Sequence, residues 1–238
     1  MNRASPSKTS WVRSVFNLLT QSLRVDFSAK ERLITPVFFA AIILLLFSFA
    51  IPEQPPTMRS RMMIAESLLA VFFALQIALS RAFEAERTDR VFDHIRLSPV
   101  DSSAFITAKL LHVLLVGGGV TFFTLILSLL LQGQDLSLVT DPVVFGGFTL
   151  TLIGLAGLGV LLAAITLRAE AQQILFPLLY FPLSVPVLLC SSEALVQWLE
   201  TRKWDDTMRG WSVMLIAFDA IYLTMTVLLG TESVDTGQ

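Results

Sequence analysis

Six long apolar stretches alternate with short polar segments along the chain. They cover approximately residues 33–51, 62–80, 104–131, 143–167, 174–195 and 210–230. Each reaches or approaches the ~20 residues that an α-helix needs to cross the ~30 Å hydrocarbon core of a bilayer. Segments 40–50 and 122–131 contain almost no polar residues, so no side of these helices suits water. The pattern predicts an all-α integral membrane protein with six transmembrane helices.

A second pattern precedes the first span. Apolar residues recur at helical spacing on one side of the segment 10–31, at Val12, Val15, Phe16, Leu19, Leu23 and Phe27. Polar residues such as Arg13 and Arg24 lie on the other sides, which is typical of an amphipathic helix in the membrane interface. The alternative is a soluble helix packed on the protein's own cytoplasmic loops. We expect a disordered tail over 1–9, a transmembrane domain over 32–230 and a cytoplasmic tail over 231–238.

Composition supports a membrane protein and excludes several sites. The chain has 54% hydrophobic residues, 15% charged residues and a mean hydropathy of +0.71. A transmembrane barrel would show short alternating strands in place of long apolar runs. The lone Cys190 lies inside an apolar run, which excludes an internal disulfide and a cysteine metal site. The first ~30 residues lack the apolar core of a cleavable signal peptide, so we expect the first span to be retained.

The basic residues predict the orientation. Twelve of the 17 Lys and Arg residues lie before the first span, between spans two and three, or between spans four and five. The other five lie on the opposite side. The positive-inside rule therefore predicts that both termini are cytoplasmic.

Several residues inside or beside the spans are candidates for function. Asp219 lies near the middle of span six, where a charge is costly, so it should face the bundle, be protonated or be paired. A functional role and a structural hydrogen bond are about equally supported. We expect neither His94, in the cytoplasmic loop, nor His112, near the inner end of span three, to ligate a metal or haem. Pro177, Pro182 and Pro186 should bend span five, and a moving hinge there is a further possibility.

Small and aromatic residues have simpler interpretations. The glycines at 117–119 and at 154, 157 and 159 indicate close packing between helices. The tryptophans Trp198, Trp204 and Trp211 indicate that the connection 196–209 lies at the outer interface.

No enzymatic motif is present. The chain contains no Walker-type phosphate loop, no His-Glu-x-x-His and no Gly-x-Ser-x-Gly. An intramembrane enzyme based on Asp219 would need a second carboxylate or a histidine at a similar depth, and the sequence suggests none. We therefore expect a protein that is not itself an enzyme.

Three separated regions resemble the CcmB family of ABC-type permeases. The first is Leu23-Arg24-Val25-Asp26 with Arg32 and then Thr35-Pro36-Val37-Phe38-Phe39. The second has Glu84, Glu86, Asp89, Arg90 and Leu97-Ser98-Pro99, followed by Ala108-Lys109. The third is the segment 178–188, Leu-Leu-Tyr-Phe-Pro-Leu-Ser-Val-Pro-Val-Leu. Arg90 and Arg96 depart from the family pattern and suggest an unusually basic docking surface.

The resemblance implies an ABC-2-exporter-like fold and a role in cytochrome c maturation. It implies a separate CcmA-like ATPase subunit, CcmC-like and CcmD-like membrane proteins and a CcmE-like haem chaperone. A second copy of the chain is a further candidate partner. ATP would be bound by the partner subunit and haem handled by the complex, in a bacterial inner membrane. A general ABC-2 permease for a lipid, polysaccharide or drug is the alternative, and the proline pattern of span five argues against it.

The cytoplasmic loop is the expected contact with the ATPase. It is the longest cytoplasmic connection, and a short apolar set there can fill a groove while charged residues pair around it. The residues that we expect to form this coupling element are Glu84, Glu86, Asp89, Arg90, Phe92, Ile95, Leu97, Ser98 and Pro99. A solvated loop that only satisfies the positive-inside rule would explain the arginines, but not the interspersed acids and Phe92.

Overall fold

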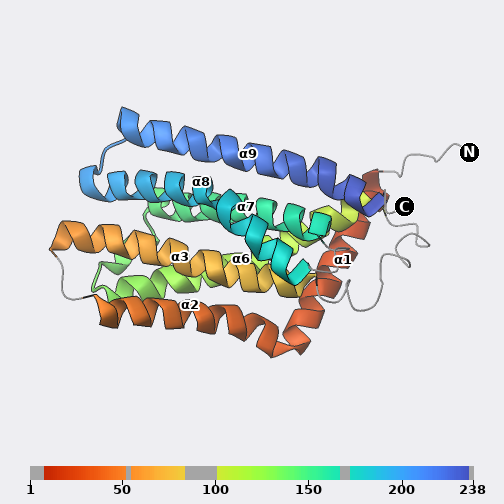
Figure 1. Ribbon diagram of the computed structural model, residues 1–238, viewed down its shortest axis with the longest axis horizontal. Coiled ribbons are helices and arrows are strands. Elements are labelled where there is room, and N and C mark those ends of the chain that lie inside the picture. The colour runs from red at the N-terminus through yellow and green to blue at the C-terminus, as the bar shows by residue number, and fades with distance from the viewer. Residues whose placement is uncertain (1–7, 52–54, 84–100, 167–171, 236–238) are drawn as a thin grey trace, which may run out of the picture.

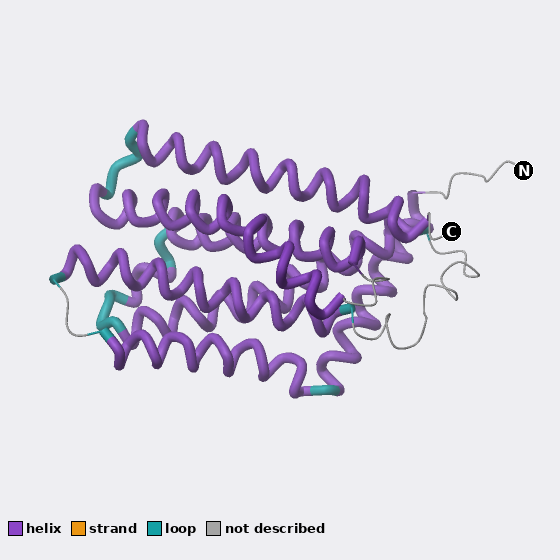
Figure 2. The backbone as a smooth tube through the Cα atoms, viewed as in Figure 1, coloured by secondary structure: helices purple, strands orange, loops and turns teal. Residues whose placement is uncertain are grey.

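The chain folds into a bundle of long helices with one helix lying across an end (Figure 1). The computed structural model describes residues 8–51, 55–83, 101–166 and 172–235. In these residues all regular structure is helical (Figure 2). The helices are α1 (Lys8–Ser28), α2 (Lys30–Ala50), α3 (Pro56–Ala82), α6 (Ser102–Leu131), the 3-10 helix η1 (Leu136–Val139), α7 (Pro142–Thr166), α8 (Gln172–Thr201) and α9 (Asp206–Asp235).

The predicted fold class is confirmed. Six helices in the described residues are long and apolar enough to cross a membrane: α2, most of α3, α6, α7, α8 and most of α9. Several helices extend beyond the apolar stretches from which they were predicted. α8 continues to Thr201 and α9 to Asp235, so the helix enters the segment that we expected to form a tail. α1 begins at Lys8, two residues before the expected start.

Helix α1 lies across the end of the bundle that also contains the C-terminal end of α9 (Figure 1). It packs against α6: Val15 is buried with Ala104 and Ala108, and the indole N–H of Trp11 donates to Ser103 Oγ over 2.9 Å. Val12, Phe16 and Phe27 remain exposed. The apolar stripe is therefore divided, because one side packs on the bundle and the other stays exposed. The interfacial location of α1 stays a prediction.

Helix α7 lies at the centre of the bundle and packs against α3, α6, α8 and α9. Its small residues permit close approach on two sides. A Cβ at Gly159 would overlap with Leu79 of α3, and a Cβ at Gly154 would overlap with the Asp219 carboxylate of α9. A larger residue at either position would push a neighbouring helix away, which accounts for the glycines in this span.

Helix α8 changes direction along its length (Figure 1). Pro177, Pro182 and Pro186 all lie inside it. Each proline removes a backbone donor and crowds the preceding turn, which is the usual cause of such a bend. The bend brings the aromatic residues of α8 against α3: the Tyr180 ring stacks on Phe72 at 5.2 Å and on Phe176 at 5.3 Å between centroids.

Candidate functional site at the polar end of the bundle

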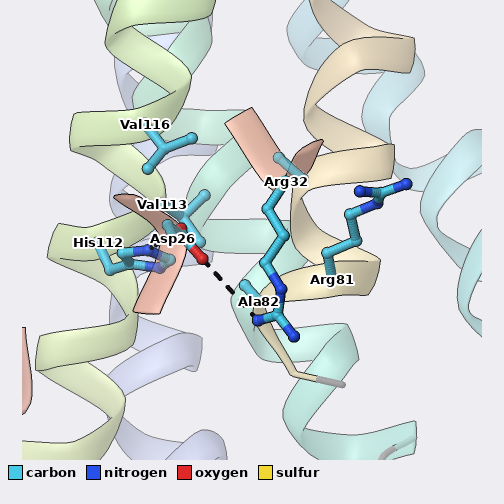
Figure 3. Close-up of a pocket in the computed structure, with 8 residues that line it drawn as sticks. Asp26, Arg32, Arg81, Ala82, His112, Val113 and Val116 are labelled. Atoms are coloured by element: carbon cyan, nitrogen blue, oxygen red, sulfur yellow. Dashed lines mark hydrogen bonds and ion pairs between the residues drawn. The ribbon is translucent and has the colours of Figure 1, made fainter. Parts of the chain in front are cut away.

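A buried polar cluster joins three helices where α1 crosses the bundle. Asp26 of α1 is 8% exposed and His112 of α6 is 4% exposed. The Nε2–H of His112 donates to Asp26 Oδ2 over 2.7 Å, and Arg32 Nη1 of α2 lies 3.9 Å from Asp26 Oδ1. Figure 3 shows Asp26 between the imidazole and the guanidinium. Removal of either partner would leave a buried charge poorly compensated, so the cluster fixes the position of α1 on the bundle.

Two further contacts hold the last turn of α3 in the same region. Lys109 of α6 donates to the carbonyl oxygen of Ala82 over 2.7 Å. The Lys109 ammonium also lies over the rings of Phe83 and Phe105, at 5.4 and 5.8 Å from their centroids. Arg81 points away from Asp26 in Figure 3, and its Nη1 donates to the carbonyl oxygen of Glu31 over 3.2 Å. A cation at the C-terminal end of a helix stabilises its unpaired carbonyl groups, as Lys109 does at the end of α3. Together with the Arg81–Glu31 contact, this joins α2, α3 and α6 where α3 ends.

The predicted coupling residues follow this joint in the sequence. Glu84, Glu86, Asp89, Arg90, Phe92, Ile95, Leu97, Ser98 and Pro99 lie outside the described residues, as does His94. The described structure contains the two ends to which they connect. Phe83 closes α3 with 1% exposure, and Asp101 caps α6 by accepting the backbone N–H of Ser103 over 3.0 Å. The role of the segment stays a prediction.

Asp219 lies within the bundle, away from this cluster. It is 4% exposed, and neither of its carboxylate oxygens has a hydrogen-bond partner among the described residues. Its side chain occupies the space opposite Gly154 and near Val187 of α8. Two hydroxyl groups that follow it in α9 do have hydrogen-bond partners. Tyr222 donates to the carbonyl oxygen of Leu183 over 2.7 Å, and Thr226 donates to that of Gly157 over 2.8 Å. Asp219 therefore faces the bundle, one of the alternatives expected for it.

The sequence reasoning missed a second buried carboxylate, Glu66 of α3. It is 2% exposed and accepts from Ser128 Oγ over 3.2 Å and from Gln132 Nε2 over 2.9 Å. We expected no second acidic residue as deep as Asp219, and Glu66, near the end of its span, leaves that expectation standing. Its partner Gln132 caps the C-terminal end of α6, so Glu66 lies toward the end of the bundle opposite α1. A glutamate inside the apolar run 62–80 was the available signal.

A third polar group closes the end of the bundle opposite α1. Asp141 caps α7 by accepting the backbone N–H of Val143 over 2.9 Å. Its carboxylate also accepts from Trp198 Nε1 over 3.0 Å and from Arg202 over 2.6 Å. Burial alone would raise the pKa of Asp141, but these hydrogen bonds and the Arg202 charge outweigh burial and lower the pKa. Trp198 is thus a partner of a carboxylate, whereas Trp204 is 53% exposed, as expected at an interface.

The three prolines of α8 have different surroundings. Pro182 is exposed on the outside of the bundle, while Pro177 and Pro186 are half-buried. Next to them, Tyr180 is fully buried and donates to the carbonyl oxygen of Leu155 in α7 over 3.3 Å. The bend is thus packed against both α3 and α7. A hinge motion at these prolines stays a prediction.

The Asp26–His112 pair was the other feature that the sequence did not indicate. The two residues are 86 positions apart. For His112 we expected only that it does not ligate a metal or haem. Its Nδ1 is buried with no hydrogen-bond partner among the described residues. The one clue was that Asp26 and Arg32 lie in the motif that resembles the CcmB family, before a span that begins with an apolar run.

Comparison with known proteins agrees with this architecture. A family model described as "CcmB protein" matches residues 13–236. The chain is also 29% identical over 220 residues to a protein of Pseudomonas aeruginosa named "Heme exporter protein B", a match that covers 90% of this chain and 93% of the relative. The family match includes α2 to α9 and all but the first turn of α1. The chain belongs to the CcmB protein family.

Proposed function

We propose that this chain is the membrane permease subunit of an ABC-type complex that supports haem delivery in cytochrome c maturation, driven by a separate CcmA-like ATPase subunit. Membership of the CcmB family over residues 13–236 is the observation that carries the proposal. The name of the Pseudomonas aeruginosa relative supports the assignment to haem export. The six spans supply the membrane domain that such a subunit needs.

The polar end of the bundle supports the role of the segment 84–99 as the coupling element. Residues 84–100 connect α3 to α6, and Lys109 already joins those two helices through the carbonyl of Ala82. Arg81 and the Asp26 cluster extend the connection to α2 and α1. A force applied between Ala82 and Ser102 would therefore reach four helices together. An ATPase outside the membrane needs a connection of this kind to move helices inside it.

We further propose that this subunit transmits movement to a haem-bearing neighbour instead of conducting haem itself. His112 is occupied by Asp26, and among the described residues no three His, Cys, Asp or Glu side chains gather as a ligand set. The neighbours would be CcmC-like and CcmD-like membrane proteins and a CcmE-like chaperone. The complex would lie in the bacterial inner membrane, with both termini of this chain cytoplasmic.

The coupling proposal is tested by Phe92→Ala. Truncation of a central aromatic contact commonly costs about 2 kcal/mol or more at an interface, so the ATPase should dissociate from the permease. We expect Phe92→Ala to insert and accumulate normally, to lose co-purification with the ATPase subunit and to abolish cytochrome c production. Phe123→Ala is a matched control, because Phe123 lies inside the span formed by α6 and is itself exposed.

A charge reversal provides the second arm. Glu86→Lys should also weaken ATPase binding, because it removes an acid from the expected rim of the interface. Full ATPase binding by both Phe92→Ala and Glu86→Lys would place the coupling site elsewhere, with the loop 168–173 as the next candidate. Neighbouring genes for an unrelated export system would instead favour a general ABC-2 permease.

A further inference from the structure

An apolar groove opens between α1, α2 and α6, on the membrane side of the Asp26 cluster. Its volume is about 400 Å³, which falls within the range of sites for small organic ligands. It is lined by Leu23 and Phe27 of α1, Leu33 and Val37 of α2, and Leu115 and Val120 of α6, with Asp26 at one end. Gly119 also lines the groove, and a Cβ built there would meet nothing within 4 Å.

Basic residues lie close in sequence to the residues that line the groove where α1 meets α2. Arg24 and Lys30 are both exposed. Arg24 directly follows the lining residue Leu23, and Lys30 lies three positions before the lining residue Leu33, so each cation lies within one helical turn of the lining. Arg32 Nη1 lies 3.9 Å from Oδ1 of Asp26, which lines the groove, and the Arg32 side chain is 25% exposed.

The negative charge at the groove is already compensated. Asp26 accepts from His112 and faces Arg32, so the anionic group at the end of the groove has its own partners. Arg24 and Lys30 remain as exposed cations within one helical turn of residues that line the groove. The site therefore combines an apolar groove with nearby cations. This combination is complementary to an amphiphile with an anionic headgroup.

We propose that this groove binds one anionic phospholipid from the leaflet that contains α1. One acyl chain would lie along Leu33, Val37, Leu115 and Val120, and the phosphate group would lie near Arg24, Lys30 and Arg32. Basic pockets between transmembrane helices recognise such headgroups. The lipid would fill the space between α1 and the bundle, and so hold α1 in register with the Asp26–His112 pair. The proposal does not depend on the ATPase partner or on the direction of the chain in the membrane.

The headgroup must supply the selectivity. Lipid tails elsewhere in the bilayer are as apolar as the groove, so transfer of an acyl chain into it gains little. Each juxtamembrane cation instead strengthens the binding of an anionic headgroup about fivefold. A zwitterionic phospholipid of the same chain length should therefore occupy the site much more weakly.

The test is native mass spectrometry of the full-length chain, purified from nanodiscs that contain equal amounts of phosphatidylglycerol and phosphatidylethanolamine. The unmodified chain should retain one phosphatidylglycerol. Gly119→Leu places a side chain in the groove without a backbone clash and should lower this retention at least tenfold. Gly146→Leu is the matched control: Gly146 lies in α7, a Cβ there also meets nothing within 4 Å, and it does not line the groove.

A double variant separates headgroup recognition from packing. Arg24→Gln with Lys30→Gln changes only exposed side chains, so the fold should be kept, and the preference for phosphatidylglycerol should fall about fivefold per cation. This variant also tests whether the groove selects an anionic phospholipid if Gly119→Leu fails to accumulate. Equal retention of both lipids by the unmodified chain would overturn the proposal, as would equal loss from Gly119→Leu and Gly146→Leu. A photo-reactive residue at position 119 that captures a protein in place of a lipid would assign the groove to a partner subunit.

Discussion

Asp219 shows how a single polar side chain can be accommodated between helices. Its carboxylate is buried without a hydrogen-bond partner among the described residues, yet it fits because Gly154 of α7 leaves room for it. Asp219 and Gly154 therefore constrain each other. A change in the size of either residue should therefore lower the stability of the bundle more than a change in its polarity.

We expect Asp219→Asn to be tolerated and Asp219→Leu to be destabilising. Asparagine keeps the shape of the side chain and removes the cost of an ionised group in the membrane. Leucine is larger and branched opposite Gly154 and Val187, and overpacking of this kind costs about 1–3 kcal/mol. The thermal unfolding midpoint in detergent and the amount of protein in membranes measure both effects. Wild-type behaviour of both variants would show that residue 219 has no role in packing or function.

Asp141 predicts a pH dependence at the other end of the bundle. Its pKa is lowered below the ordinary value of 3.8 in the folded protein, since its hydrogen bonds and Arg202 outweigh burial. A lowered pKa contributes stability that is fully present above the unfolded-state value and is lost as pH falls through the folded-state value.

The thermal midpoint should therefore fall more steeply for the unmodified chain than for Asp141→Asn as the pH drops below about 4. The Asn variant cannot titrate at this position and should be less stable near neutral pH. A matched control is Asp206→Asn, because Asp206 is fully exposed in its 3.5 Å contact with Arg209. Parallel pH curves for all three proteins would contradict the assignment.

Residues with local signals could be predicted, and those with distant partners could not. Asp219 and the prolines of α8 stand out because they interrupt apolar runs. The Asp26–His112 and Asp141–Trp198 pairs join residues 86 and 57 positions apart, and no spacing in the sequence indicates them. Glu66 had a local signal, but the hydrogen bonds to its carboxylate come from Ser128 and Gln132, outside α3.

At the scale of elements, the length and composition of the apolar stretches were sufficient to place the spans. They were not sufficient to place helix ends, because polar residues can continue a helix beyond the hydrocarbon. α8 runs past the end of its apolar stretch to Thr201 and stops where Arg202 adopts a left-handed conformation with φ of 52°. Which side of α1 is packed and which is exposed also could not be predicted, because it depends on the position of α6.

The aromatic stack between α8 and α3 gives a prediction at this scale. Tyr180→Phe keeps the contacts with Phe72 and Phe176 and loses one hydrogen bond to Leu155, which should cost less than about 1 kcal/mol. Tyr180→Ala should cost about 3 kcal/mol, because it leaves a cavity where α8 bends. Thermal unfolding of the purified variants measures the difference. Similar losses for both would mean that the hydroxyl, and not the ring, holds α8 in place.

The topology of the whole molecule is testable with fusion reporters. The twelve-to-five distribution of basic residues predicts that both termini are cytoplasmic. A reporter fused after Gln238 should be active in the cytoplasm, and one inserted near Gln134, between α6 and η1, should report the outside. The reverse result would invert the bundle and place the segment 84–99 out of reach of a cytoplasmic ATPase.

The contact between Asp26 and His112 also sets an order of events during synthesis. His112 is the 86th residue that the ribosome adds after Asp26, which takes roughly 4–17 s at typical elongation rates. During that interval the newborn α1 has no α6 to pack against. In the predicted interfacial position of α1, Val12, Phe16 and Phe27, which remain exposed in the finished bundle, would contact lipid until α6 has been synthesised.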